Sequence, residues 1–209
     1  MTEPLTAAEV RVLGCLLEKE ATTPDAYPLT LNALRTACNQ SSNRDPVVRY
    51  DDDTVQAALD SLRARSLTRI VYSTVNRATK YRHVLPEALG LDSAEKAVLT
   101  LLMLRGPQTV GEVRTRSDRL HGFDSLGDVE AVVDRLAGRD EPLVRRLPRA
   151  PGQKDGRVTH LLAGEPVEPA PGDRPAEEPR SGADDRLSVL EAEVAALRAE
   201  VADLRALFD

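Results

Sequence analysis

The most restrictive feature of this sequence is an internal repeat, in which one pattern of segments occurs twice. Three segments of the first copy correspond in order to three of the second: LTAAEVRVLGCLLEKE (5–20) to LDSAEKAVLTLLMLRG (91–106), TLNALRTA (30–37) to TVGEVRTR (109–116), and VQAALDSL (55–62) to VEAVVDRL (129–136). The apolar residues in these segments recur at the spacing of an amphipathic helix. The chain is therefore predicted to contain two related units of three helices each.

Two β-type runs follow the third helix of each unit. They are LTRIVYS and KYRHVL in the first unit, and PLVRRL and RVTHLL in the second. Three helices closed by a β-hairpin form the winged helix-turn-helix arrangement. We predict a mainly α fold with small β-hairpin wings (α+β), with tandem winged-helix domains at residues 1–89 and 90–164. Thr6 and Ser93 are the predicted N-caps of the two first helices.

The first unit has longer loops than the second, and CNQSSNRDPVVRYDDDTV (38–55) is one of these insertions. Asp51, Asp52 and Asp53 are predicted to cap the third helix and to favour its dipole, and they would repel phosphates there. For Arg44 and Asp45 an ordinary connector and a packing role between the two units are both open.

The third helices are poor candidates for reading bases. In the first unit only Gln56 and Arg63 are exposed residues suited to base edges, and the second unit exposes mostly Asp and Glu. Sequence reading led by these helices is therefore not expected.

The predicted hairpins carry most of the candidate DNA contacts. The candidates in the first unit are Gln56 and the basic residues Arg63, Arg65, Arg69, Arg77, Lys80 and Arg82. The candidates in the second unit are Arg145, Arg146, Arg149, Lys154 and Arg157. Such groups bind phosphates by releasing counterions. The alternative is a solvated hairpin whose charges prevent edge-to-edge pairing. Both interpretations are open for residues 63–83, and the second is preferred for residues 143–157.

Net charge does not argue against a nucleic-acid ligand. The chain carries −6 at pH 7, but residues 165–209 alone hold five basic and twelve acidic residues. The acidity therefore belongs to the tail, and the remainder is close to neutral.

No motif for catalysis, a cofactor or a metal is present. Cys15 and Cys38 have no partner at metal-ligand spacing and are expected to be buried thiols, and His83 and His160 are expected to pack within the hairpins. The N-terminus resembles no secretion signal and no apolar run is long enough for a bilayer. We expect a cytoplasmic protein that is not an enzyme and has no membrane association.

The C-terminal part predicts a linker and a dimerising helix. Residues 165–185 hold five prolines and a strong acidic balance, which predicts disorder. Apolar residues then alternate at spacings of three and four over 186–208: Leu187, Leu190, Val194, Leu197, Val201, Leu204 and Phe208. This pattern predicts a parallel two-stranded coiled coil and a homodimer. A helix that folds back on its own chain is the alternative.

Several long stretches resemble a known family. CLLEKEATTPDAYPLTLNAL, TACNQSSNRDPVV and LLMLRGPQTVGEVRTRSDRLHGF are similar to the YceH-like family of bacterial tandem winged-helix proteins without an assigned role. The resemblance implies the fold and supplies no catalytic residues. Two functions are expected: a DNA-associated regulatory or architectural protein that holds duplex through its wings, or a protein-interaction module that does not bind DNA.

Overall fold

A computed structural model describes residues 3–72, 79–149 and 155–165. Their helices and strands, in chain order, are α1 (Ala7–Thr22), the 3-10 turn η1 (Pro24–Ala26), β1 (Leu29–Thr30), α2 (Leu31–Cys38), α3 (Asp52–Ala64), β2 (Thr68–Val71), β3 (Lys80–His83), α4 (Leu85–Leu89), α5 (Ser93–Arg105), β4 (Gln108–Thr109), α6 (Val110–Ser117), α7 (Leu126–Ala137), β5 (Val144–Arg146) and β6 (Arg157–His160). This is a mixed α+β structure with small antiparallel sheets. The heptad segment 186–208 lies outside the described residues, and so does the acidic segment 165–185 except for Glu165.

The two copies of the repeat have the same order of elements. Three α-helices and a three-stranded antiparallel sheet correspond between the copies, with strand order β1-β3-β2 in the first and β4-β6-β5 in the second. The first copy has the short elements η1 and α4 in addition. The predicted hairpin strands are confirmed as β2–β3 and β5–β6. The third strands, β1 and β4, were not predicted, because a strand of two residues is too short to show alternation.

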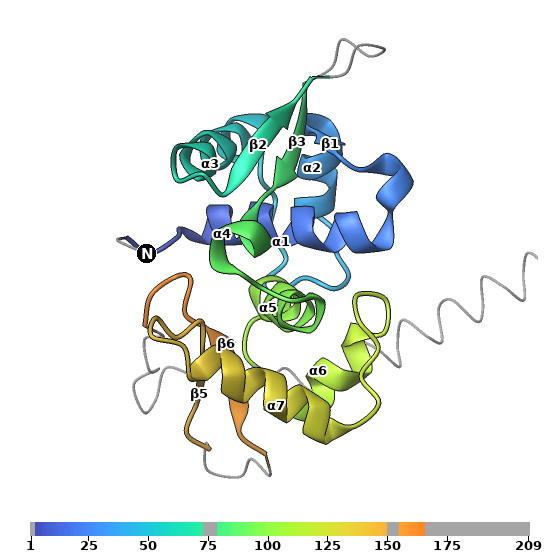
Figure 1. Ribbon diagram of the computed structural model, residues 1–209. Helices are drawn as coiled ribbons and strands as arrows, with labels where there is room; N and C mark the ends of the chain where they lie inside the picture. The colour runs from blue at the N-terminus through green and yellow to red at the C-terminus, as the bar shows by residue number, and fades with distance from the viewer. Residues whose placement is uncertain (1–2, 73–78, 150–154, 166–209) are drawn as a thin grey trace, which may run out of the picture. The chain divides into compact units, whose positions relative to one another are not determined.

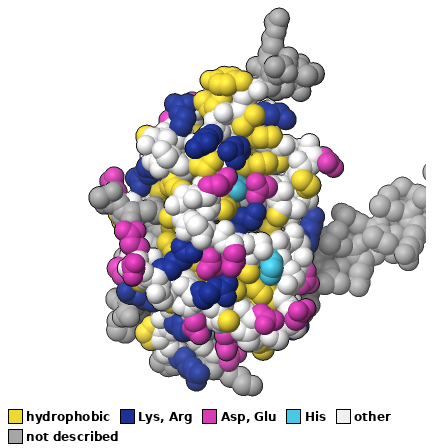
Figure 2. Space-filling view, in the orientation of Figure 1, with side chains coloured by type: hydrophobic (Ala, Val, Ile, Leu, Met, Phe, Trp, Pro, Cys, Tyr) yellow, Lys and Arg dark blue, Asp and Glu magenta, His cyan; other side chains and the backbone are white. Residues whose placement is uncertain are grey.

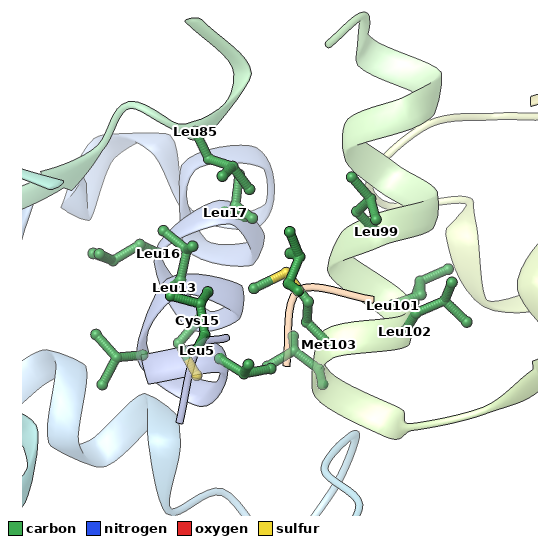
Figure 3. Close-up of a cluster of buried hydrophobic side chains, with 14 of the residues drawn as sticks. Leu5, Leu13, Cys15, Leu16, Leu17, Leu85, Leu99, Leu101, Leu102 and Met103 are labelled. Carbon is green, nitrogen blue, oxygen red and sulfur yellow. The ribbon is translucent and has the colours of Figure 1, made fainter. Parts of the chain in front are cut away.

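Helices α1 and α5 form the centre of the fold, and the two sheets lie on opposite sides of this pair (Figure 1). The close-up in Figure 3 shows Met103 of α5 between the two helices, and Leu16 of α1 and Leu102 of α5 pointing away from the other helix. Leu13, Leu17 and Leu99 belong to the same cluster. All are almost completely buried, as the helical spacing predicts. The two copies therefore share one hydrophobic core within a single compact unit, Met1–Pro166.

The close approach of α1 and α5 depends on Gly14. A Cβ atom at this position would lie 2.9 Å from Cδ2 of Leu104 and 3.3 Å from Cβ of Met103. Glycine costs about 0.5–1 kcal/mol in a helix relative to alanine, so the contact with α5 explains its place in the middle of α1.

The cap of α1 is as predicted, and the cap of α5 is not. Thr6 and Glu9 form a capping box at α1. At α5 the N-cap is Asp92, whose carboxylate accepts the Glu95 N–H at 2.7 Å, and Ser93 is the first helical residue. The prediction for Ser93 was wrong by one position, because Asp92 has the extended backbone that a cap needs and lies three residues before Glu95.

The long loop after α2 connects the two copies. The Asp45 N–H donates to the Leu104 carbonyl of α5 at 2.9 Å, and Arg105 donates to the Asn43 side chain. The packing role between copies is therefore confirmed for Asp45. Arg44 has its contacts within the first copy, where it is buried against Glu18.

Both cysteines are buried free thiols, as predicted. None of the helices in the described ranges combines the length and apolar character that a bilayer span requires.

Candidate nucleic-acid interface

The β2–β3 hairpin has two chemically different faces. Its register pairs Thr68 with His83, Arg69 with Arg82, Ile70 with Tyr81 and Val71 with Lys80. Successive residues of a strand point to opposite faces of a sheet. Thr68, His83 and Tyr81 are buried and define the inner face. The outward face of β2–β3 therefore carries Arg69, Arg82, Val71 and Lys80.

The cations of this outward face are largely uncompensated. Arg69 lies directly opposite Arg82, an arrangement of like charges that is unfavourable in an isolated sheet. Arg82 has one carboxylate neighbour, Glu87, at 3.4 Å. Within the described part of the chain no carboxylate pairs with Arg69 or Lys80. Figure 2 shows Lys and Arg side chains among hydrophobic ones over β2 and β3, while Asp and Glu gather lower in the same view.

An exposed aromatic residue lies at the end of β2. Tyr72 follows β2 directly and retains 82% of its surface accessible. In the sequence, Tyr72 stands out as an aromatic residue within the basic segment 63–83, which lacks Asp and Glu. A tyrosine ring beside cations is a common element of nucleic-acid contacts, because it stacks on bases or packs on sugars.

Two other candidates, Arg63 and Arg65, lie at the C-terminal end of α3 and differ in their contacts. Arg65 donates to the Glu3 carbonyl at 2.8 Å and lies 3.7 Å from the Glu9 carboxylate. Arg63 is exposed and pairs with Asp60 at 3.1 Å. The structure thus places Arg65 against the N-terminal segment, whereas Arg63 stays at the surface in a solvent-exposed pair.

The third helix of the first copy has few free groups for base edges. Gln56 donates to Asp60 at 3.2 Å and accepts from the Tyr81 hydroxyl at 3.1 Å. Asp51 is the N-cap, and its carboxylate accepts the Thr54 N–H at 2.8 Å. Hydrogen bonds to Thr54 also lower the pKa of Asp51. The expected capping role is confirmed for Asp51, whose carboxylate lies at the N-terminal end of α3.

The second hairpin differs from the first because the cations on its strands β5 and β6 are paired. Arg145 forms an ion pair with Glu165, Arg146 lies 2.8 Å from Asp134, and Arg157 lies 3.4 Å from Glu112. Arg149 is exposed. Arg77 and Lys154 lie outside the described residues. The structure therefore distinguishes two hairpins that looked alike in sequence.

The histidines are packed within the fold. Nε2 of His83 lies 3.0 Å from the Glu20 carboxylate, which also receives Lys96 of α5 at 2.8 Å. Burial lowers the pKa of His83 and lowers that of His160 to about 4. Nowhere in the described ranges do three His, Cys, Asp or Glu residues converge as metal ligands would.

Comparison with known proteins is consistent with the resemblance in the sequence. Residues 5–153 match the family model described as protein of unknown function, DUF480. The UPF0502 protein of Geobacter sulfurreducens is 51% identical over 203 residues, which cover 92% of this chain and 90% of the relative. The UPF0502 protein of Geotalea uraniireducens is 52% identical over 205 residues, covering 96% and 93%.

The chain belongs to the DUF480/UPF0502 family. The UPF0502 protein of Paracidovorax citrulli is 53% identical over 166 residues, which cover 78% of this chain and 71% of the relative. The resemblance to the YceH-like family of bacterial proteins is confirmed. Membership in the UPF0502 family identifies no ligand, so the function has to be argued from the surface described above.

Proposed function

We propose that this UPF0502 protein binds duplex DNA through the outward face of β2–β3, and that each copy of the repeat is a winged helix. In this proposal the β2–β3 hairpin is the wing that contacts the duplex. The observation that carries it is the pair of cations, Arg69 and Lys80, that have no carboxylate partner among the described residues and share one face with Arg82.

The contact is with the phosphate backbone and carries little base specificity. Guanidinium and ammonium groups on a hairpin neutralise phosphates regardless of sequence. The side chains that would read bases from α3 are engaged, since Gln56 is bonded to Asp60 and Tyr81. A DNA-associated architectural or regulatory role follows from such binding, with affinity that falls steeply as salt increases.

A salt series with a fluorescent duplex tests the proposal. Each phosphate contact contributes a slope of roughly 0.9 in log K against log[salt]. We expect Arg69→Glu combined with Lys80→Glu to weaken binding strongly and to lower the slope by about two. Asp60→Ala should have a smaller effect.

The second hairpin supplies a matched control. Arg145→Glu combined with Arg146→Glu changes the net charge by the same amount on cations that are already paired. This control should weaken binding less than the first double variant. Equal losses would show that only net charge matters and would contradict a defined interface on β2–β3.

A protein-interaction module is the alternative, and α7 favours it. This helix exposes Glu130 and Asp134 on the side that also carries the half-exposed Leu126. An acidic face with an apolar neighbour suits a basic protein surface better than DNA. Absence of duplex binding at low salt would exclude the first proposal and leave this one.

A further inference from the structure

A cationic groove lies between the two copies of the repeat, away from the outward face of β2–β3. Its cavity volume is about 270 Å³. It is formed by the C-terminal turn of α1, the loop after α2, and the C-terminal ends of α5 and α6, where Figure 1 shows that loop descending past α1 toward α5. The polar and charged residues that line it include Lys19, Gln40, Asn43, Arg105, Arg116 and Arg119.

Positive charge in the groove exceeds negative charge. Four cations line it, and Glu18 is its one carboxylate. Glu18 is already committed, since Arg44 lies 2.6 Å and Lys19 3.4 Å from its Oε2 atom. Arg119 is exposed and has no ion pair within the described ranges. Partial burial, followed by the nearby charge of Arg116, lowers the pKa of Arg105. Arg116 also lies 3.2 Å from Glu112 of its own helix, so Arg105 and Arg119 are the lining cations without an ion pair within the described ranges. The groove therefore keeps an excess of positive charge.

The cations are held by neighbours that leave hydrogen-bond donors available. Arg105 donates to the side-chain oxygen of Asn43, and Arg116 donates to that of Gln108 at 2.8 Å. The side-chain oxygen of Gln40 accepts from Arg44 at 2.8 Å and from Lys19 at 3.5 Å. Because the amide oxygens of Gln40 and Asn43 are occupied, the NH₂ groups are what these two side chains can offer to a ligand.

The favourable interaction of these cations with the helix dipoles explains only part of their clustering in the groove. Lys19, Arg105 and Arg116 lie in the last turns of their helices, where a cation stabilises a helix by about 0.3–1 kcal/mol. Arg119 lies beyond the end of α6 and serves no such purpose. Dipole effects also do not require that three helices direct cations into one cavity.

We propose that this groove is a binding site for a small, multiply charged oxyanion of the phosphate type. Guanidinium groups match phosphate oxygens in geometry and charge, and amide NH₂ groups complete the coordination without adding negative charge. The volume suits a phosphate or diphosphate group better than a large ligand. A ligand held by both α1 and α6 would also stabilise the junction between the two copies.

Isothermal titration calorimetry of the full-length protein with inorganic pyrophosphate tests the site. Chloride at matched ionic strength sets the baseline. We expect one pyrophosphate per chain, and about tenfold or greater loss of affinity in Arg119→Gln and in Arg105→Gln, since each removes a charge-assisted hydrogen bond. Arg149→Gln is the matched control, because it removes an exposed cation outside the groove, and it should bind like the unaltered protein.

Several results would overturn the proposal. They are no heat above the chloride baseline, equal losses in Arg119→Gln and Arg149→Gln, or citrate binding as tightly as pyrophosphate. Circular dichroism spectra of the variants show whether a loss reflects unfolding, and Arg119→Gln, an exposed position, is the decisive variant if Arg105→Gln fails to fold.

Two further arms identify the source of the phosphate and separate this site from the proposed DNA interface. ATP that binds more tightly than pyrophosphate indicates a phosphorylated small molecule, whereas equal binding indicates the phosphate groups alone. The double variant Arg69→Glu and Lys80→Glu should retain pyrophosphate binding. If that double variant lost pyrophosphate binding while Arg119→Gln kept it, the anion would bind on β2–β3 and the groove site would be refuted.

Discussion

At the scale of single residues, the ion pair between Arg44 and Glu18 stabilises the loop after α2. Both Arg44 amino groups contact the Glu18 carboxylate, at 3.0 and 2.6 Å, and the Arg44 side chain is fully buried. Its Nε–H donates to the Ala37 carbonyl. Removing Arg44 leaves the largely buried Glu18 carboxylate with Lys19, at 3.4 Å, as its remaining ion-pair partner among the described residues, and removing one partner of a buried pair is strongly destabilising.

We expect Arg44→Ala to lower the free energy of unfolding by about 3–5 kcal/mol. Arg63→Ala is the matched control. Its pair with Asp60 is half exposed, so that variant should lose less than about 1 kcal/mol. Urea unfolding followed by far-ultraviolet circular dichroism measures both. Similar losses would show that Arg44 is not a structural anchor.

His160 is expected to make stability depend on pH. Burial lowers its pKa to about 4, while an unfolded chain has a histidine pKa of about 6.5. As pH falls below 6.5 the unfolded chain takes up a proton that the folded chain does not, so stability decreases until pH approaches 4. The difference corresponds to at most about 3 kcal/mol.

His160→Leu removes this group, whose Nδ1 atom is buried and has no hydrogen-bond partner among the described residues. Unfolding free energies measured from pH 7.5 to 4 should fall less steeply in the variant than in the unaltered protein. Parallel curves would mean that His160 titrates alike in both states.

At the scale of elements, the contact between α1 and α5 depends on the missing side chain at Gly14. Gly14→Leu should lower the free energy of unfolding by about 1–3 kcal/mol, because the added atoms meet Leu104 and Met103. Gly111→Ala in α6 is the control. A Cβ there meets nothing closer than 3.9 Å, so this variant should gain about 0.5–1 kcal/mol. Thermal unfolding of both variants measures the effects, and equal shifts would contradict close packing at Gly14.

At the scale of the whole molecule, we propose that the chain forms a homodimer through residues 186–208, which lie outside the described residues. The basis is the heptad pattern of the sequence, with apolar residues at both a and d positions. Leu197→Glu combined with Leu204→Glu should convert the full-length protein to a monomer in light scattering. Ala199→Glu combined with Ala206→Glu adds the same charges at f positions and should leave the dimer intact. A monomeric unaltered protein at micromolar concentration would refute the proposal.

A dimer would also affect DNA binding. Two copies of the outward face of β2–β3 on one scaffold raise avidity for duplex without a new contact. The monomeric double variant should therefore bind duplex more weakly, with a lower salt slope per complex than the unaltered protein.

The sequence by itself determined the elements of this fold because their signals are local. Helical spacing identified the buried residues of α1 and α5, alternation of β-type runs identified both hairpins, and Asp51 at the start of α3 was recognised as a cap. It could not identify β1 and β4, which are two residues long, and it placed the cap of α5 at Ser93 when two neighbouring polar residues, Asp92 and Ser93, were both suited to the role.

Only the tertiary structure decided which charges are available to a ligand. Arg69 and Arg146 look alike in sequence, yet Arg146 is paired with Asp134 of α7 while Arg69 faces Arg82 across the hairpin. Lys19 is far from Arg105, Arg116 and Arg119 in the chain and meets them only because α1 packs against α5. Ion pairing and convergence depend on distances between elements, and a one-dimensional pattern does not contain those distances.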